Sequence, residues 1–146
     1  MYTVNIKYAN DQCEIKRGTE GAFAFDVNLN SDVPITVKAG EKVKLPTGVF
    51  VDLGDKLVGM LATLRSGLST KNSLILLNSV GVVDSDYTGE MFLVIGNLGF
   101  DGDYTFKPYE RIAQVMFIKS VDVNLNIVTE LNETVRGDGG FGHTGK

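Results

Sequence analysis

Short apolar runs separated by turn residues are the feature that most limits how this chain can fold. They recur along most of its 146 residues and are rich in Val, Ile, Leu, Phe and Tyr, which suit strands. Many short strands at regular spacing, punctuated by Gly, Asp and Asn, indicate a β-sandwich or β-barrel. We expect strands at residues 2–7, 23–29, 35–37, 42–45, 49–53, 56–64, 74–77, 80–84, 91–98, 104–106, 111–118 and 123–131.

Two turn signals and one exception complete the pattern. Pro46-Thr47-Gly48 should separate two strands, and the Asp-Gly pair in Phe100-Asp101-Gly102-Asp103 predicts a hairpin turn. Residues 66–72 lack strand alternation and predict one or two helical turns. Their first backbone N–H groups, just after Arg65, would suit an anion.

Scarce cysteine and histidine disfavour several kinds of site. The single cysteine, Cys13, can form neither an internal disulfide nor a cysteine zinc site. Its neighbours are polar, so we interpret it as a surface or strand thiol rather than a nucleophile. A Ser-His-Asp or Cys-His catalyst would depend on His143, the single histidine, in a glycine-rich tail. A metal should therefore bind oxygen, and Mg²⁺ carried by substrate phosphates is the natural candidate.

The charge and hydropathy of the chain limit its partners. A net charge of −4 argues against stable nucleic-acid binding, because phosphate backbones select basic surfaces. A small phosphorylated ligand fits if the few arginines converge. No apolar run is long enough to span a bilayer, and the first residues lack the layout of a signal peptide. We therefore expect a cytoplasmic protein.

Residues 78–90 predict a small-molecule site. Asp84 is a carboxylate in a β-branched strand, where Asp is disfavoured. Asp86-Tyr87-Thr88-Gly89 reads as a tight turn with Asp first and Gly fourth. That turn explains Asp86 and Gly89, but neither Asp84 nor an aromatic at Tyr87.

The end of the chain changes character. Residues 136–146 hold five of the 17 glycines, which oppose both helix and strand. We expect residues 1–135 to form one domain and 136–146 a flexible arm. A simple disordered tail is the alternative. Arg136, Phe141 and Thr144 are instead spaced like groups that grip a ligand, so the arm could become ordered on binding.

Five blocks in this order resemble the motifs of the trimeric dUTPases (deoxyuridine triphosphate nucleotidohydrolases), from about residue 20 to the end. They are A-F-D-V at 24–27, R-S-G-L at 65–68, G-V-V-D-S-D-Y-T-G-E at 81–90, R-I-A-Q at 111–114 and R-G-D-G-G-F-G-H-T-G at 136–145. The resemblance implies an all-β, distorted jelly-roll or β-barrel fold of the β-clip kind, with one short helix and a C-terminal arm.

The resemblance assigns roles to residues of the nucleoside pocket. Asp84 would hold the sugar 3′-hydroxyl and orient the attacking water as a general base. Tyr87 would pack on the deoxyribose and exclude ribonucleotides. Asn78, with nearby backbone groups, would read the uracil edge, because a wrong base leaves buried polar groups unpaired.

It also assigns the phosphate contacts. The substrate-binding residues would be Arg65, Ser66, Gly67 and Gln114, joined by Arg136, Phe141, Gly142, His143 and Thr144 from the arm of another subunit. Phe141 would stack on uracil and Arg136 would approach the γ-phosphate. Asp26 would organise the metal–water shell, or serve a structural role instead. The sequence departs from the family pattern at Ala24, where glycine is usual, and at Leu64, where proline is usual.

The implied function is Mg²⁺-dependent hydrolysis of dUTP to dUMP and pyrophosphate by water attack on the α-phosphorus. It would supply dUMP for thymidylate synthesis and keep uracil out of DNA, in a homotrimer with shared active sites. A dCTP deaminase, which shares the fold, is the nearest enzymatic alternative, but Asp84 and the arm speak against it. A binding or regulatory protein that has kept the fold is the alternative of another class.

Overall fold

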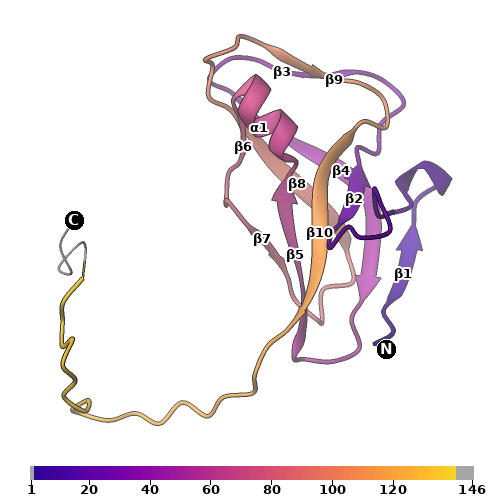
Figure 1. Cartoon of the computed structure of the whole chain (residues 1–146). Helices are drawn as coiled ribbons and strands as arrows, with labels where there is room; N and C mark the ends of the chain where they lie inside the picture. Colours follow the sequence, from indigo (N-terminus) through magenta and orange to yellow (C-terminus); the bar gives the residue numbers. More distant parts are fainter. Residues whose placement is uncertain (1, 141–146) are drawn as a thin grey trace.

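The computed structural model describes residues 2–140, and these form a mostly β body with an extended C-terminal segment (Figure 1). All but the last expected range overlaps an observed strand. The elements are β1 (Asn5–Tyr8), η1 (Asp11–Cys13), β2 (Phe25–Asn28), β3 (Ile35–Val37), β4 (Lys42–Asp52), β5 (Val58–Leu64), α1 (Ser66–Asn72), β6 (Leu74–Leu76), β7 (Gly81–Val83), β8 (Glu90–Asn97), β9 (Tyr104–Phe106) and β10 (Arg111–Lys119).

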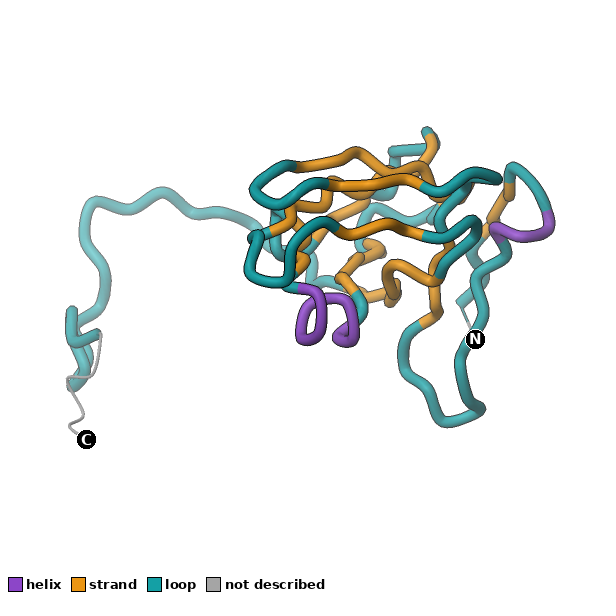
Figure 2. Tube along the Cα trace, turned by 90° about the horizontal axis from the view of Figure 1, so that it is seen from above, coloured by secondary structure: helices purple, strands orange, loops and turns teal. Residues whose placement is uncertain are grey.

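Two four-stranded antiparallel sheets make the body. One has the order β1-β4-β8-β6 and the other β2-β10-β5-β7, and β3 pairs with β9 in a small third sheet. Seen from above, the strands gather into one body, with α1 at its edge (Figure 2). This arrangement is jelly-roll-like, as expected. The sheets of the described residues do not close into a barrel.

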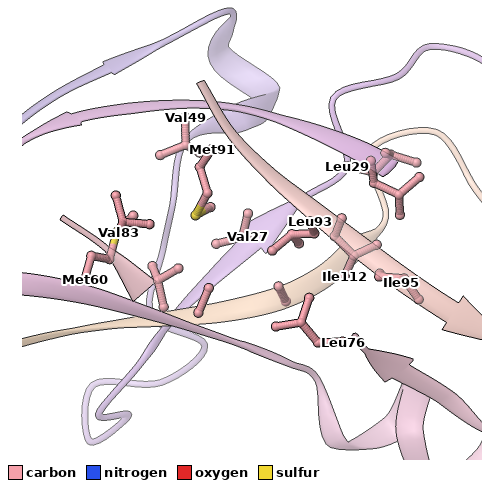
Figure 3. Close-up of a cluster of buried hydrophobic side chains, with 14 of the residues drawn as sticks. Val27, Leu29, Val49, Met60, Leu76, Val83, Met91, Leu93, Ile95 and Ile112 are labelled. Atoms are coloured by element: carbon pink, nitrogen blue, oxygen red, sulfur yellow. The ribbon is translucent and has the colours of Figure 1, made fainter. Parts of the chain in front are cut away.

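The core lies between the two larger sheets. Along β8, Met91, Leu93 and Ile95 are buried whereas Phe92 and Val94 are exposed, because successive side chains of a strand point to opposite faces. Figure 3 shows such residues meeting Val27 and others across the core. Each fully buried side chain of this kind contributes about 1.5–3 kcal/mol to folding.

Strand β4 runs unbroken through the predicted break at Pro46-Thr47-Gly48. Its pairing with β8 shifts register between Pro46 and Phe50, so the chain bulges there instead of turning. Gly48 has a φ of +64°, and its N–H donates to the Glu90 carboxylate at 2.8 Å. Buried Thr47 donates its hydroxyl to the Met91 carbonyl at 2.6 Å. These contacts come from distant residues, which local turn chemistry could not reveal.

The helix at 66–72 is confirmed as α1, which buries Leu68 and ends at Ser73 in a left-handed conformation. The turn at 99–102 forms, with the Gly102 N–H donating to the Gly99 carbonyl at 3.4 Å. The hairpin predicted there is wrong, because β8 and β9 lie in different sheets.

The strand expected at 123–131 is absent, and the segment after β10 leaves the body instead (Figure 1). Its apolar side chains are exposed, with Leu125 at 85% and Ile127 at 96%. The alternation is real, but the segment extends away from the sheets and pairs with no strand of the described residues. No helix in the described part is long and apolar enough to cross a membrane.

Candidate active site

A hollow of about 440 Å³ opens where β7 and β8 separate. The two strands are consecutive in the chain but do not pair: β7 pairs with β5, and β8 with β4 and β6. The connection between them therefore bridges the two sheets at an open edge. The lining is Ala62, Leu76, Leu77, Asn78, Gly81, Val82, Val83, Met91, Phe92, Leu93 and Val94.

Asn78 is the amide side chain of this mostly apolar lining. Gly81 lets Asn78 and Ala62 pack closely beside it, because an added Cβ would lie 3.4 Å from the Ala62 Cβ and 3.6 Å from the Asn78 amide nitrogen. An apolar hollow with an amide at its edge can take a flat polar ring and read its hydrogen-bonding edge.

A second hollow of about 310 Å³ adjoins the first and carries Asp84 and Tyr87 in its wall, along with Lys44. Asp84 lies just after β7 rather than inside the strand, which corrects the sequence prediction. The tight turn spans 84–87 rather than 86–89, since the Tyr87 N–H donates to the Asp84 carbonyl at 3.2 Å. Asp84 is thus the first residue of the turn, where Asp is favoured.

Tyr87 is held by its hydroxyl, which donates to the Glu90 carbonyl at 2.8 Å. The ring crosses Gly89 so closely that a Cβ there would lie 2.9 Å from the ring carbon Cζ. Gly89 therefore serves the placement of the ring, and the exposed side chain is fixed at the mouth of the hollow.

A separate cleft of about 310 Å³ lies beside the start of α1. Its lining unites three predicted blocks, with Asp26 from β2, Arg65 and the residues after it, and Gln114 from β10. The register places Gln114 beside Asp26 on one side and Thr63 on the other. The full lining is Asp26, Arg65, Ser66, Gly67, Leu68, Lys71, Glu110, Arg111 and Gln114.

Asp26 fixes both arginines of this cleft. One carboxylate oxygen forms an ion pair with Arg65 Nε at 3.3 Å, and the other accepts a hydrogen bond from Arg111 Nη1 at 3.0 Å. The Asp26 side chain is only 17% exposed, so this pairing is less screened by water than a surface ion pair. Arg65 also donates to the Arg111 carbonyl at 3.4 Å. The guanidinium of Arg65 is thereby oriented before any ligand arrives.

Strand β5 separates the nucleoside-sized hollows from the basic cleft. Val83 pairs with Met60, so Asp84 comes beside Gly59, whereas Arg65 follows the other end of the strand. Gly59 and Arg65 are six residues apart, so at about 3.3 Å per strand residue the backbone positions of Asp84 and Arg65 are about 20 Å apart. The structure therefore brings the predicted residues together in two sets within one chain, and not in one.

The match to known proteins agrees with these motifs. A family model described as dUTPase matches residues 11–145. The chain belongs to the dUTPase family. That match speaks against the dCTP deaminase alternative.

The relatives of this dUTPase include bacterial enzymes. It is 42% identical over 128 residues to the deoxyuridine 5′-triphosphate nucleotidohydrolase of Haemophilus ducreyi, covering 88% of this chain and 84% of the relative. It is 35% identical to that of Janthinobacterium sp., over 100% of this chain and 99% of the relative.

Solved structures share the fold. The dUTPase of Staphylococcus bacteriophage 80alpha with dUPNHPP has a TM-score of 0.88 at 23% identity, and the alignment covers both chains fully. A dUTPase from Streptococcus mutans has a TM-score of 0.71 at 25% identity, over 83% of this chain and 98% of that one.

The remaining predicted groups are those of the C-terminal arm and Cys13. Phe141, Gly142, His143 and Thr144 fall outside the described residues. Arg136 is exposed, and its Nε donates to the nearby Gly139 carbonyl at 2.9 Å. Cys13 is buried in η1 rather than at the surface or in a strand, and burial raises the pKa of its thiol, which opposes nucleophilic chemistry.

The described part of the chain holds no group of three or more His, Cys, Asp or Glu side chains that could bind a metal. The two carboxylates in the basic cleft already accept protein hydrogen bonds. Glu110 accepts from the Tyr104 hydroxyl at 2.6 Å and the Lys107 N–H at 2.8 Å, and burial with this bond raises the pKa of Tyr104. A metal in this cleft would need ligand oxygens from elsewhere.

The sequence motifs did not single out Lys71, Glu110 or Lys44, which also line the hollows. For Lys71 a signal existed, because it lies four residues after Gly67 in the expected helix and so shares its face. The other two depend on long-range packing.

Proposed function

We propose that this dUTPase hydrolyses dUTP to dUMP and pyrophosphate by water attack on the α-phosphorus. The observation that carries the proposal is the pairing of a nucleoside-sized hollow, bordered by Asp84 and Tyr87, with a basic cleft in which Asp26 orients Arg65. The first suits a base and sugar, and the second suits a polyphosphate.

In the nucleoside hollows, Asn78 and neighbouring backbone groups read the uracil edge, and Tyr87 packs on the deoxyribose. Asp84 binds the 3′-hydroxyl and holds the attacking water. The water oxygen forms a bond to the α-phosphorus while the bond to the bridging α–β oxygen breaks. The water proton passes to the Asp84 carboxylate, and pyrophosphate leaves with the electrons of the broken bond.

In the basic cleft, Arg65, Ser66, Gly67 and Gln114 bind the triphosphate. Pre-oriented donors of this kind stabilise the charge that develops on the phosphate oxygens without reorganising at the moment of reaction. The arm (136–146) closes over the domain (1–135) and excludes water. Phe141 stacks on uracil, and Arg136 and Thr144 contact the γ-phosphate. The other substrate-binding residues of the arm are Gly142 and His143.

Mg²⁺ would be held by the triphosphate oxygens and by water, and Asp26 is the candidate carboxylate to orient that water. Hard oxygen ligands from phosphate suit Mg²⁺, which keeps several waters when bound. When bound, the ion neutralises part of the phosphate charge.

The enzyme works as a homotrimer with shared sites. The roughly 20 Å along β5 between the backbone positions of Asp84 and Arg65 exceeds the spacing of the phosphates in one nucleotide, which supports a site that takes its two halves from different chains. A second copy then supplies the missing half, and the arm of a third reaches the same site.

The outer face of the sheet β2-β10-β5-β7 supports an assembly of copies. Leu61 pairs with both Met116 and Val82, on the side opposite the core residues Met60 and Val83. Val82 is 66% exposed and Ile118 on the same sheet is 40% exposed. Apolar surface of this kind, together with the exposed apolar residues after β10, favours burial against other subunits.

The product dUMP would feed thymidylate synthesis, and removal of dUTP would keep uracil out of DNA. We propose action in the cytoplasm without stable nucleic-acid binding. A regulatory role beside catalysis, the alternative from the sequence, stays a prediction.

The test is pyrophosphate release with dUTP, dCTP, dTTP and UTP as separate substrates, each with Mg²⁺ and with Mg²⁺ chelated. We expect turnover of dUTP alone, and only with the metal. Equal turnover of dUTP and dCTP, or none of either, would contradict the proposal.

A further inference from the structure

One cation of the basic cleft has no carboxylate partner among the described residues. The cleft is lined by three cationic side chains, Arg65, Lys71 and Arg111, and by the carboxylates of Asp26 and Glu110. Asp26 pairs with both arginines, and none of the ion pairs of the described residues involves Lys71. Lys71 is therefore the cationic side chain of this cleft that no described carboxylate holds, and the cleft carries one more positive than negative charge.

The helix directs Lys71 toward the phosphate-binding residues. Lys71 lies four residues after Gly67 in α1, so the two share one face of the helix. A helical side chain leans toward the N-terminus and covers the turn before its own Cα, which here is the turn of Ser66 and Gly67. Buried Leu68 anchors this short helix against the core.

Gly67 leaves that surface open. A Cβ at this position would meet no atom within 4 Å, so the space beside Ser66 and Gly67 is available to a ligand. The Lys71 stem can reach over it, since glycine presents no side chain in between. Arg65 is held in place by Asp26, whereas the ammonium of Lys71 is a mobile point charge on a flexible stem.

We propose that Lys71 is a substrate-binding residue that contacts the β- or γ-phosphate of dUTP and makes the site prefer a triphosphate to a monophosphate. This inference rests on the proposed function. Arg65 supplies a fixed, directional contact, and Lys71 supplies a positive charge without a carboxylate partner among the described residues, which attracts the most highly charged part of the substrate.

The test compares Lys71→Gln, which keeps most of the stem, and Lys71→Arg with the wild type and with Lys38→Ala. Lys38 is an exposed lysine that does not line the cleft. For Lys71→Gln we expect the KM for dUTP and the inhibition constant of pyrophosphate to rise about tenfold, the size of a charge-assisted contact at a partly exposed site. The inhibition constant of dUMP should stay within about twofold of wild type, because dUMP lacks the outer phosphates.

Lys71→Arg should retain most of the pyrophosphate affinity, and the salt dependence of pyrophosphate binding should be shallower in Lys71→Gln than in wild type and in Lys38→Ala. Unchanged pyrophosphate inhibition in Lys71→Gln would overturn the inference, as would equal weakening of dUMP and pyrophosphate. Thermal unfolding of each variant identifies any loss of fold. A wild-type enzyme that does not hydrolyse dUTP would instead reject the proposed function.

Discussion

At the scale of single residues, two carboxylates with different surroundings divide the work of the site. Asp26 is mostly buried and bonded to Arg65 and Arg111, so its role is to orient cations. Asp84 is exposed at the start of a turn and makes no ion pair among the described residues, so its oxygens remain available to a water or a sugar hydroxyl. These surroundings favour Asp84 over Asp26 for the general base of the proposed mechanism.

Asp84→Asn should remove turnover and spare binding. The amide keeps the shape of the carboxylate and its place in the turn, but it cannot take a proton from water. We expect kcat to fall by about 10²–10⁴-fold, the usual contribution of a general base, with the dissociation constant of dUTP nearly unchanged. Pre-steady-state turnover and equilibrium binding measure the two quantities.

The matched control is Asp86→Asn, two residues along the same turn, which should retain near-wild-type kcat. A wild-type rate in Asp84→Asn would remove this residue from the base role.

At the scale of secondary structure, α1 contains a predicted phosphate-binding residue, Gly67, that lowers the stability of the helix. Gly67 lies in the helix, where glycine costs about 1 kcal/mol relative to alanine. No close packing inside the chain requires it, since a Cβ would have open space. The glycine is therefore explained by the approach of a ligand to the backbone.

Gly67→Ala should stabilise the protein and impair it at once. We expect the free energy of unfolding to rise by up to about 1 kcal/mol, while the KM for dUTP increases because the new methyl group occupies the phosphate surface. Denaturant unfolding and steady-state kinetics report the two effects. Ser69→Ala, on the same helix outside the cleft, should leave the KM unchanged. A lower stability without a change in KM would mean that Gly67 serves folding instead.

The elements also show which parts of the fold are readable from local sequence. Alternation of apolar and polar residues predicts the short strands, and its absence predicts the helix at 66–72; these elements form largely as expected. Local sequence does not predict the bulge at Gly48, because the bulge depends on a hydrogen bond to Glu90 across the sheet. The same holds for the ion pairs of Asp26, since its partners lie far along the chain and meet only through strand register.

At the scale of the whole molecule, the account depends on parts that one chain holds apart. The resemblance to the family motifs predicted that Asp84 and Arg65 belong to one site, but within one chain they lie near opposite ends of β5. The alternation at 123–131 predicted a strand, but the segment pairs with no strand of the described residues. In the proposed trimer both departures have one physical reason, because other copies of the chain would complete the site and pair with this segment.

Two truncations should divide the C-terminal segment into parts with different roles. Removal of everything after Val135 deletes the arm, so we expect a large loss of rate while the trimeric mass persists. Removal after Ser120 also deletes the exposed apolar residues, including Leu125 and Ile127, and should weaken the trimer. Sedimentation and dUTP hydrolysis on both proteins test this. A monomeric mass for the full chain would contradict the shared site.

The most direct measurement of the central claim mixes two inactive variants, Asp84→Asn and Arg65→Ala, by unfolding and refolding them together. If each site takes its nucleoside half from one chain and its phosphate half from another, a random mixture of equal amounts, homotrimers included, should regain about a quarter of the wild-type dUTP hydrolysis. Each variant refolded alone should stay inactive. No recovery in mixed trimers whose composition is verified by mass would contradict a site shared between chains.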